Sequence, residues 1–306
     1  PNLFFPGKTQ FFDFNGKSSM NLINSVNPLS WKSTANYINN IEPDLVIFQY
    51  WMPFFAPAFS SIAKKIKNTN DTKIIVNCNN IIPHESGIFD KYLSLKFFKH
   101  CDYFIVMSDS VKNDLLNMIP SANYIESKHP LYDTFGNSID KEEARKSLSL
   151  KSDKVILNFG LIRDYKGLDL LIEATDNLKN KLDDFKIVVA GECYNREQQY
   201  YELARKLGVE DCFDFKFKFV ENSDIPKYFC AADVVVLPYK SATQSGIIPI
   251  AYHYNKPVIT TNVGGLAECV LHGKTGFICD TNPQSISNGI LEFFNSNENF
   301  INNVNE

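Results

Sequence analysis

Two cationic side chains stand three residues apart in the segment FGLIRDYKG, residues 159–167. Arg163 offers a planar fork of N–H donors and Lys166 a compact point charge, and together they can neutralise a diphosphate. The chain has only four arginines, so a guanidinium inside a motif is scarce. Because the segment follows an apolar run and precedes a helical pattern, it is a candidate phosphate-binding loop, with a solvated basic turn as the alternative.

A second candidate loop is PYKSATQSGIIPI, residues 238–250, which also follows an apolar run. Gln244, Ser245 and Gly246 place small and polar residues at a predicted helix start, where backbone N–H groups favour an anion. An ordinary helix cap explains the same residues equally well.

A third loop, TNVGGLAE at residues 261–268, contains the pair Gly264 and Gly265. Adjacent glycines predict a close approach of the backbone to another group, or a tight turn. The following HGKTGFI lacks the glycine spacing of a P-loop, so that motif is rejected.

In both halves of the chain, short apolar runs alternate with segments of helical period, which predicts α/β units on parallel sheets. The predicted strands are residues 44–49, 73–78, 102–107, 123–126, 154–159, 186–190, 213–217, 233–237 and 257–261. The predicted helices are residues 57–67, 91–100, 110–118, 140–148, 167–179, 196–207, 223–230, 246–254 and 283–294. Residues 129–138 contain Pro and Gly without a sustained period, so we expect one domain over residues 1–135 and another over 136–306.

The composition excludes several classes of protein. With 44% hydrophobic and 22% charged residues and a net charge of −4, neither disorder nor nucleic-acid binding is indicated. The seven cysteines form no C-x-x-C pair, so neither a disulfide framework nor a zinc site is expected. No apolar stretch approaches the ~20 residues of a spanning helix and no signal peptide is recognisable, so we expect a cytoplasmic protein.

The order and spacing of these motifs resemble a known family. The segments FGLIRDYKGLDLLIEA, KIVVAGE, LPYKSATQSG and NKPVITTNVGGLAECVLHGKTGFI are similar to the nucleotide-sugar-binding half of family 4 (group 1) retaining glycosyltransferases. CNNIIPHES and FIVMSDSVKNDLL resemble the acceptor-side domain more loosely. The resemblance implies GT-B architecture, an α/β fold of two Rossmann-like domains with parallel sheets facing a central cleft. Because residues 1–43 lack the family's glycine-rich first loop, we expect an incomplete first domain and truncation at both termini.

The resemblance also implies roles for individual residues. Lys166 matches the family's lysine directly and Arg163 lies two positions beyond its usual arginine; both are implied to hold the donor diphosphate and to stabilise the departing nucleotide. The implied donor-binding residues are Gly160, Gln244, Ser245, Gly246, Gly264, Gly265 and Glu268. His84 is implied to be catalytic, and Asn79, Asn80 and Glu85 to lie on the acceptor side. No metal and no cofactor besides the nucleotide-sugar donor are implied, and the chain contains no D-x-D motif.

Besides the missing glycine-rich loop and the shifted arginine, the chain departs from the family pattern at two further places. Most members carry two Glu residues across the second loop, where this chain has Ala242 or Thr243 and Ile250 or Ala251. The usual His of the first half is replaced by Asn79.

The expected function is retaining transfer of a sugar from a nucleotide-diphosphate sugar to a glycan or lipid-linked hydroxyl in bacterial polysaccharide biosynthesis. The alternatives are a catalytically impaired nucleotide-binding homologue and a nucleotide-sugar epimerase of the same architecture. The aromatic stretch YWMPFFAPAF, residues 50–59, leaves peripheral membrane contact open, although core packing is the favoured interpretation.

Overall fold

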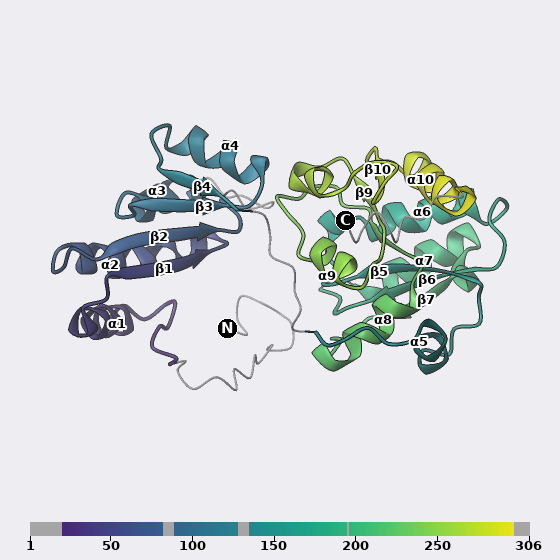
Figure 1. The fold of residues 1–306 in the computed structure, drawn as a ribbon, viewed down its shortest axis with the longest axis horizontal. Coiled ribbons are helices and arrows are strands. Elements are labelled where there is room, and N and C mark those ends of the chain that lie inside the picture. Colours follow the sequence, from purple (N-terminus) through teal and green to yellow (C-terminus); the bar gives the residue numbers. More distant parts are fainter. Residues whose placement is uncertain (1–19, 82–88, 128–134, 195, 297–306) are drawn as a thin grey trace. The chain divides into compact units, whose positions relative to one another are not determined.

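The computed structural model describes residues 20–81, 89–127, 135–194 and 196–296. They form two compact units, a first unit over residues 20–127 and a second unit over residues 135–296. Each unit contains one parallel sheet, which confirms the predicted α/β class (Figure 1). None of the helices in the described ranges is both long and apolar enough to cross a bilayer.

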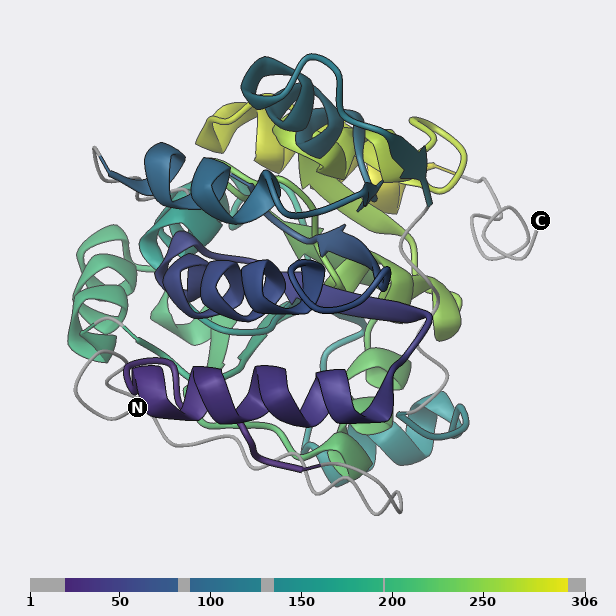
Figure 2. The same cartoon turned by 90° about the vertical axis from the view of Figure 1, so that its left-hand side faces the viewer.

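The first unit has a sheet in which neighbouring strands follow one another in the chain. Its strands, in order, are β1 (Leu45–Tyr50), β2 (Lys73–Cys78), β3 (Tyr103–Val106) and β4 (Tyr124–Glu126). Its helices are α1 (Pro28–Ile41), α2 (Ala56–Lys67), α3 (Asp90–Phe98) and α4 (Asp109–Met118), with a 3-10 turn η1 over Pro53–Phe55. Right-handed crossovers that always step in one direction place α2, α3 and α4 on the same sheet face. Figure 2 shows α2, in dark blue, in front of the strands.

The core of the first unit lies on that helix-covered face. Tyr50 is fully buried and its ring lies 5.7 Å from that of Phe97 on α3. The aromatic stretch therefore packs mainly into the core, as favoured from the sequence. On the opposite face, Ile47, Tyr103 and Ile125 remain 53, 45 and 65% exposed. This face has no helix of the described residues over it, because every crossover steps the same way.

The strand order of the second unit reverses once. Its sheet order is β10-β9-β8-β5-β6-β7, with β5 (Lys154–Phe159), β6 (Phe185–Ala190), β7 (Phe213–Lys216), β8 (Val234–Leu237), β9 (Val258–Thr261) and β10 (Gly276–Cys279). The helices are α5 (Lys141–Ser147), α6 (Leu168–Leu178), α7 (Glu197–Leu207), α8 (Ile225–Ala231), α9 (Ile247–His253) and α10 (Pro283–Asn295). The 3-10 turns are η2 (Asp164–Lys166), η3 (Glu210–Cys212), η4 (Asn222–Asp224) and η5 (Gly264–Cys269). From β5 the chain steps to β6 and β7, then returns to the other side of β5 as β8.

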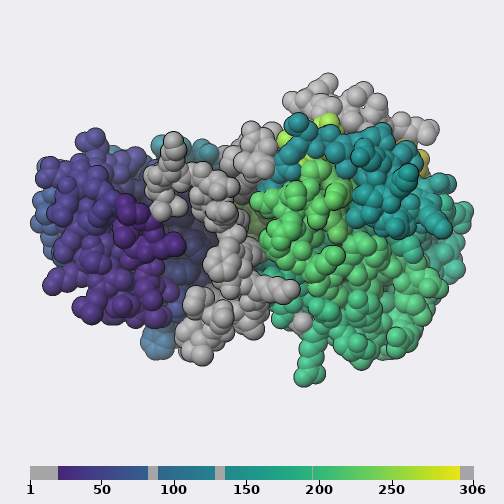
Figure 3. Space-filling view, turned by 90° about the horizontal axis from the view of Figure 1, so that it is seen from below, coloured from purple at the N-terminus to yellow at the C-terminus, as the bar shows by residue number. Residues whose placement is uncertain are grey.

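This reversal covers both faces of the sheet with helices. Side chains of β5 accordingly alternate between two separate cores, with Ile156 in one and Val155 and Leu157 in the other. α6 and α10 pack together against the first core, and α5 packs beside α8 over the second. Figure 3 shows α5 in teal and α8 in green, side by side on one surface of the unit.

The start of the second unit is hydrogen-bonded to the C-terminal end of α9. The Tyr254 hydroxyl donates to the carbonyls of Phe135 and Gly136, at 3.2 and 3.1 Å. Residues 135–138 of the predicted linker therefore pack against the second unit, and residues 129–134 lie outside the described part of the chain.

Two elements were absent from the sequence prediction. Helix α1 is one, and its apolar period is weak because Thr34 and Ala35 are its only buried residues. Its signal was the pair Asn27 and Pro28, since the Asn27 side chain accepts from the Leu29 amide and caps the helix. The other is strand β10, Gly276–Cys279, which begins with a glycine, a residue depleted in strands.

Candidate functional site

The strand order of the second unit gathers four loops at one edge of the sheet. β5 lies between β8 and β6, and β9 pairs with the other side of β8. All pairings are parallel, so the loops after these strands leave from the same edge. The point at which strand order reverses, between β5 and β8, is where open α/β sheets bind ligands. The predicted residues of the second unit occupy these loops.

The loop after β5 is fastened directly to the loop after β8. The Lys240 amide donates to the Tyr165 carbonyl at 2.7 Å. Gly167 has φ +68°, and a Cβ at this position would lie 1.9 Å from the Pro238 carbonyl oxygen. Only glycine permits so close an approach. The turn that contains Arg163 and Lys166 is therefore held against the start of the loop that contains Ser245.

The loop after β8 is fastened in turn to the loop after β9. The Gly265 amide donates to the Thr243 carbonyl at 3.1 Å. Gly264 has φ +48°, and a Cβ there would lie 1.6 Å from the Ala242 carbonyl oxygen. The close backbone approach predicted for the glycine pair is therefore present. Gly265 is buried, whereas Glu268 is exposed near the end of η5.

The two predicted cations each lie against an aromatic ring. The Arg163 guanidinium carbon lies 4.7 Å from the centroid of Tyr194, and Lys166 Nζ lies 5.1 Å from that of Tyr239. Neither cation forms a salt bridge with any carboxylate of the described residues. By contrast, Lys240 Nζ in the same loop cluster is paired with Asp169 at 2.5 Å.

Gly160 leaves room for the amine of Lys166. A Cβ on Gly160 would lie 3.4 Å from Lys166 Nζ and 3.2 Å from Ile247 Cδ1. The ammonium group therefore lies near the first residue of α9, directly after Gly246. Arg163 directly precedes η2 and Lys166 is its last residue, so only the left-handed Gly167 separates Lys166 from α6.

Ser245 and Gly246 lie beside this cation. Ser245 Oγ accepts from the Ile247 amide at 3.3 Å and is 3.5 Å from the Tyr239 hydroxyl. Within the described ranges, the backbone amides of Ser245 and Gly246 donate no hydrogen bond to another residue. α9 has only seven residues, so its dipole adds little to these amides. Gln244 is half-buried in the same loop.

Sequence reasoning missed the two tyrosines. Tyr194 is held by its own amide, which donates to the Ile162 carbonyl at 3.0 Å, and its hydroxyl donates to Glu192 Oε2 at 3.3 Å. Burial and the neighbouring Glu192 carboxylate raise the pKa of Tyr194, so its phenol stays neutral near pH 7. The available signal was their position, since Tyr239 follows β8 by two residues and Tyr194 follows β6 by four.

The predicted acceptor-side residues lie in the first unit. Asn79 and Asn80 follow the carboxyl end of β2, and the Asn79 amide donates to the Tyr50 carbonyl at 2.8 Å. Both are half-buried, and Asn80 Oδ1 has no hydrogen-bond partner among the described residues. His84 and Glu85 lie outside the described residues.

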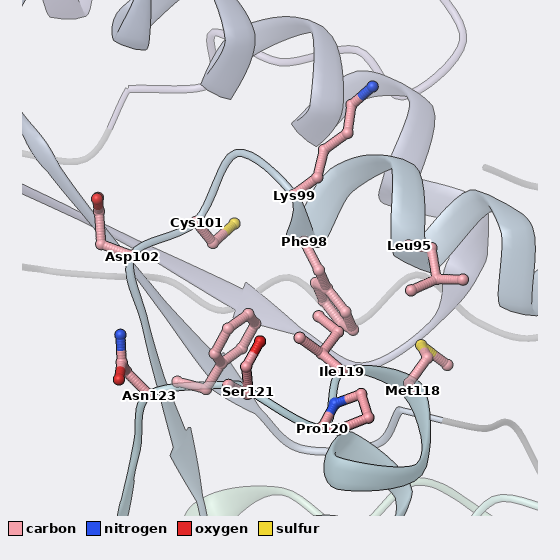
Figure 4. A pocket seen from close by; sticks show the side chains of 12 residues that line it. Leu95, Phe98, Lys99, Cys101, Asp102, Met118, Ile119, Pro120, Ser121 and Asn123 are labelled. Atoms are coloured by element: carbon pink, nitrogen blue, oxygen red, sulfur yellow. The ribbon is translucent and has the colours of Figure 1, made fainter.

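The first unit also contains a cavity of about 400 Å³ that none of the predicted residues lines. It lies before β3 and β4, at the opposite ends of the strands from Asn79. Figure 4 shows Phe98 and Ile119 pointing toward one another in it, while Lys99 points away. Its lining is mainly apolar and offers no constellation for catalysis.

The sequence profile of the family "Glycosyl transferases group 1" matches residues 140–306, more than half of the chain. The chain belongs to this family. YtcC of Bacillus subtilis (strain 168) is 30% identical over 195 residues, which cover 60% of this chain and 47% of YtcC. D-inositol 3-phosphate glycosyltransferase 2 of Catenulispora acidiphila is 32% identical over 146 residues, 45% of this chain and 34% of that protein. The chain spans about half the length of the first relatives it matches.

Solved structures show the same fold. Sucrose-phosphate synthase of Thermosynechococcus elongatus superposes with a TM-score of 0.75 at 16% identity, covering 91% of this chain and 73% of that one. Anabaena Alr3699/HepE in complex with UDP gives 0.70 at 18% identity, covering 90% and 76%. With its two parallel sheets, the group 1 chain therefore has the expected GT-B architecture of two Rossmann-like units.

Proposed function

We propose that the second unit binds a nucleoside-diphosphate sugar at the four gathered loops and that the protein transfers the sugar to a hydroxyl acceptor. The observation that carries the proposal is the junction between the loops after β5 and β8. The Lys240–Tyr165 hydrogen bond and the Gly167–Pro238 contact hold the turn of Arg163 and Lys166, which form no salt bridge within the described residues, against the loop that contains Ser245 and Gly246. Such a cluster suits a pyrophosphate, which carries several negative charges on a small group.

The chemical step assigned to these residues is departure of the nucleotide. As the bond from the anomeric carbon to the diphosphate oxygen breaks, negative charge develops on that oxygen. Arg163 and Lys166, together with the amides of Ser245 and Gly246, stabilise this charge. We propose family 4 chemistry with retention of configuration, in which the acceptor attacks from the face that the nucleotide leaves. The residues gathered here supply positive charge themselves, so the proposed step uses no metal and no cofactor.

The acceptor is proposed to be a glycan or a lipid-linked hydroxyl, bound with the help of Asn79, Asn80, His84 and Glu85. Support for this substrate class comes from a structural neighbour, WaaG, which is named as a glycosyltransferase involved in lipopolysaccharide biosynthesis. We propose a cytoplasmic location with peripheral contact to the membrane, which the exposed rings of Trp51, Phe89 and Tyr92 support.

Lysine substitution tests the donor site. Lys166→Ala removes one charge-assisted contact, so binding of UDP or GDP should lose about 1.5 to 3 kcal/mol of free energy. The Kd should therefore rise roughly 10- to 150-fold. Lys240→Ala is the matched control, because that ammonium is already neutralised by Asp169 and only its backbone amide joins the loops. Calorimetry on both variants decides the matter. Equal affinities of Lys166→Ala and wild type would remove this lysine from the site.

A nucleotide-binding homologue without turnover is the second candidate. It is favoured by the two positions at which most members carry glutamates, which fall at Ala242 or Thr243 and at Ile250 or Ala251, all of them buried and none acidic. Incubation with a panel of nucleotide sugars and hydroxyl acceptors, followed by product analysis, separates the two. Glycosylated acceptor with the donor's anomeric configuration supports the retaining transferase. Donor binding without transfer supports the impaired homologue, and isomerised donor indicates an epimerase.

A further inference from the structure

The cations of the second unit are used in two different ways. Arg145 and Lys141 both form salt bridges with Asp233, at 2.9 and 2.6 Å. These salt bridges neutralise both cations and hold α5 against the residue that precedes β8. Arg163 and Lys166 instead form no salt bridge among the described residues, and each lies over an aromatic ring. The difference requires an explanation, because long cationic side chains at loop ends lose rotamer entropy when they are held in place.

A ring holds a cation without cancelling its charge. The negative face of a tyrosine attracts a guanidinium or ammonium within ~6 Å, yet the ring carries no net charge. A carboxylate in the same place would compete with an incoming diphosphate for the cation. Rings at 4.7 and 5.1 Å therefore fix each cation and leave its full charge for a ligand.

Both rings come from loops that the sheet itself places. Tyr194 follows β6 and is anchored through its amide to the Ile162 carbonyl, one residue before Arg163. Tyr239 follows β8 and is 3% exposed, and Thr261 Oγ1 donates to its carbonyl at 2.5 Å. Since β5 lies between β6 and β8, each neighbouring strand contributes one ring to the loop that follows β5.

We propose that Tyr194 and Tyr239 are positioning residues, which hold Arg163 and Lys166 as unneutralised cations ready for the donor diphosphate. This inference rests on the proposed function. Neither tyrosine is assigned contact with the reacting atoms. Their effect on the ligand passes through the cations that they hold.

A double-mutant cycle on Tyr194 and Arg163 tests the inference. Tyr194 is half-buried, so Tyr194→Leu is expected to fold, and its Kd for UDP or GDP should rise roughly two- to fivefold. Tyr194→Phe keeps the ring and should bind near the wild-type value. In an Arg163→Gln background, Tyr194→Leu should cause no further loss, because the cation that it holds is gone. A purely structural effect of Tyr194 would persist in that background.

Tyr201→Leu is the control, because this partly exposed tyrosine contacts Phe215 and Phe217 and, within the part of the chain that the structure describes, no cation. It should bind as wild type does. For the buried Tyr239, Tyr239→Phe should also bind as wild type, and a loss as large as that of Lys166→Ala would assign the effect to the hydroxyl and overturn this half of the inference.

The possible failures are distinguishable. A wild-type protein that binds neither UDP nor GDP refutes the proposed function itself. A wild type that binds, with Tyr194→Leu equally tight or with equal losses in both Arg163 backgrounds, refutes the positioning role alone.

Discussion

The junction between the loops after β5 and β8 depends on Gly167, which makes its substitution the most informative structural test. In Gly167→Ala the new Cβ would lie 1.9 Å from the Pro238 carbonyl oxygen, a distance that requires the backbone to shift. A left-handed backbone costs an L-residue about 1 to 2 kcal/mol. Forced separation adds about 1 to 3 kcal/mol of overpacking, and loss of the Lys240–Tyr165 hydrogen bond adds about 1 kcal/mol.

The free energy of unfolding of the second unit should therefore fall by about 3 to 6 kcal/mol in Gly167→Ala. Gly273→Ala is the matched control, because Gly273 has φ +75° but a Cβ there would meet nothing within 4 Å. It should cost only the backbone term of about 1 to 2 kcal/mol. The difference between the unfolding free energies lost in the two variants therefore measures the contribution of the junction between the loops after β5 and β8.

The measurement must report on the second unit. Both tryptophans, Trp31 and Trp51, lie in the first unit, so urea unfolding should be followed by tryptophan fluorescence and by far-UV circular dichroism, and a transition seen only by dichroism belongs to the second unit. Hydrogen exchange at the Lys240 amide gives a local readout, since this amide is the donor to Tyr165. The reasoning is refuted if Gly167→Ala and Gly273→Ala unfold alike and the Lys240 amide stays equally protected in both.

Two further predictions concern the first unit. Burial raises the pKa of Asp102, but hydrogen bonds from Lys67 and the Ile74 amide outweigh burial and hold that pKa below its usual value. The ionised carboxylate therefore stabilises the first unit above about pH 4, and this contribution is lost as the pH falls through the lowered pKa. Asp102→Asn should remove this acid-side loss, which tryptophan-detected urea midpoints between about pH 2 and pH 7 would show, and equal slopes for variant and wild type would contradict it. Burial raises the pKa of Cys78 to about 12 and leaves it no exposed surface, so iodoacetamide on the native protein should label the exposed Cys269 and spare Cys78, as peptide mass spectrometry would reveal.

Local pattern was sufficient to find most elements. Runs such as KVILNF and DVVVL are buried on both faces and carry no helical period, so β5 and β8 could be predicted from the sequence. Helix α1 was missed because its buried residues, Thr34 and Ala35, are small or polar and give no clear apolar period, and an N-cap alone is a weak signal. Arg163, Lys166 and the glycine pair could be singled out because charge and backbone freedom are properties of residue types.

What only the tertiary structure decided is which loops are neighbours. Sequence order places the loop after β5 far from the loop after β8, and the pairing β6-β5-β8 makes them adjacent. Strand order depends on how the crossover helices cover the two faces of the sheet. This packing is made between segments far apart in the chain, so the hydrophobic periodicity of a single segment does not predict it. Tyr194 and Tyr239 could therefore not be assigned to their cations in advance. The residue types in one turn predicted a site for an anion, and the order of the strands determined that this turn lies beside the loop that contains Ser245.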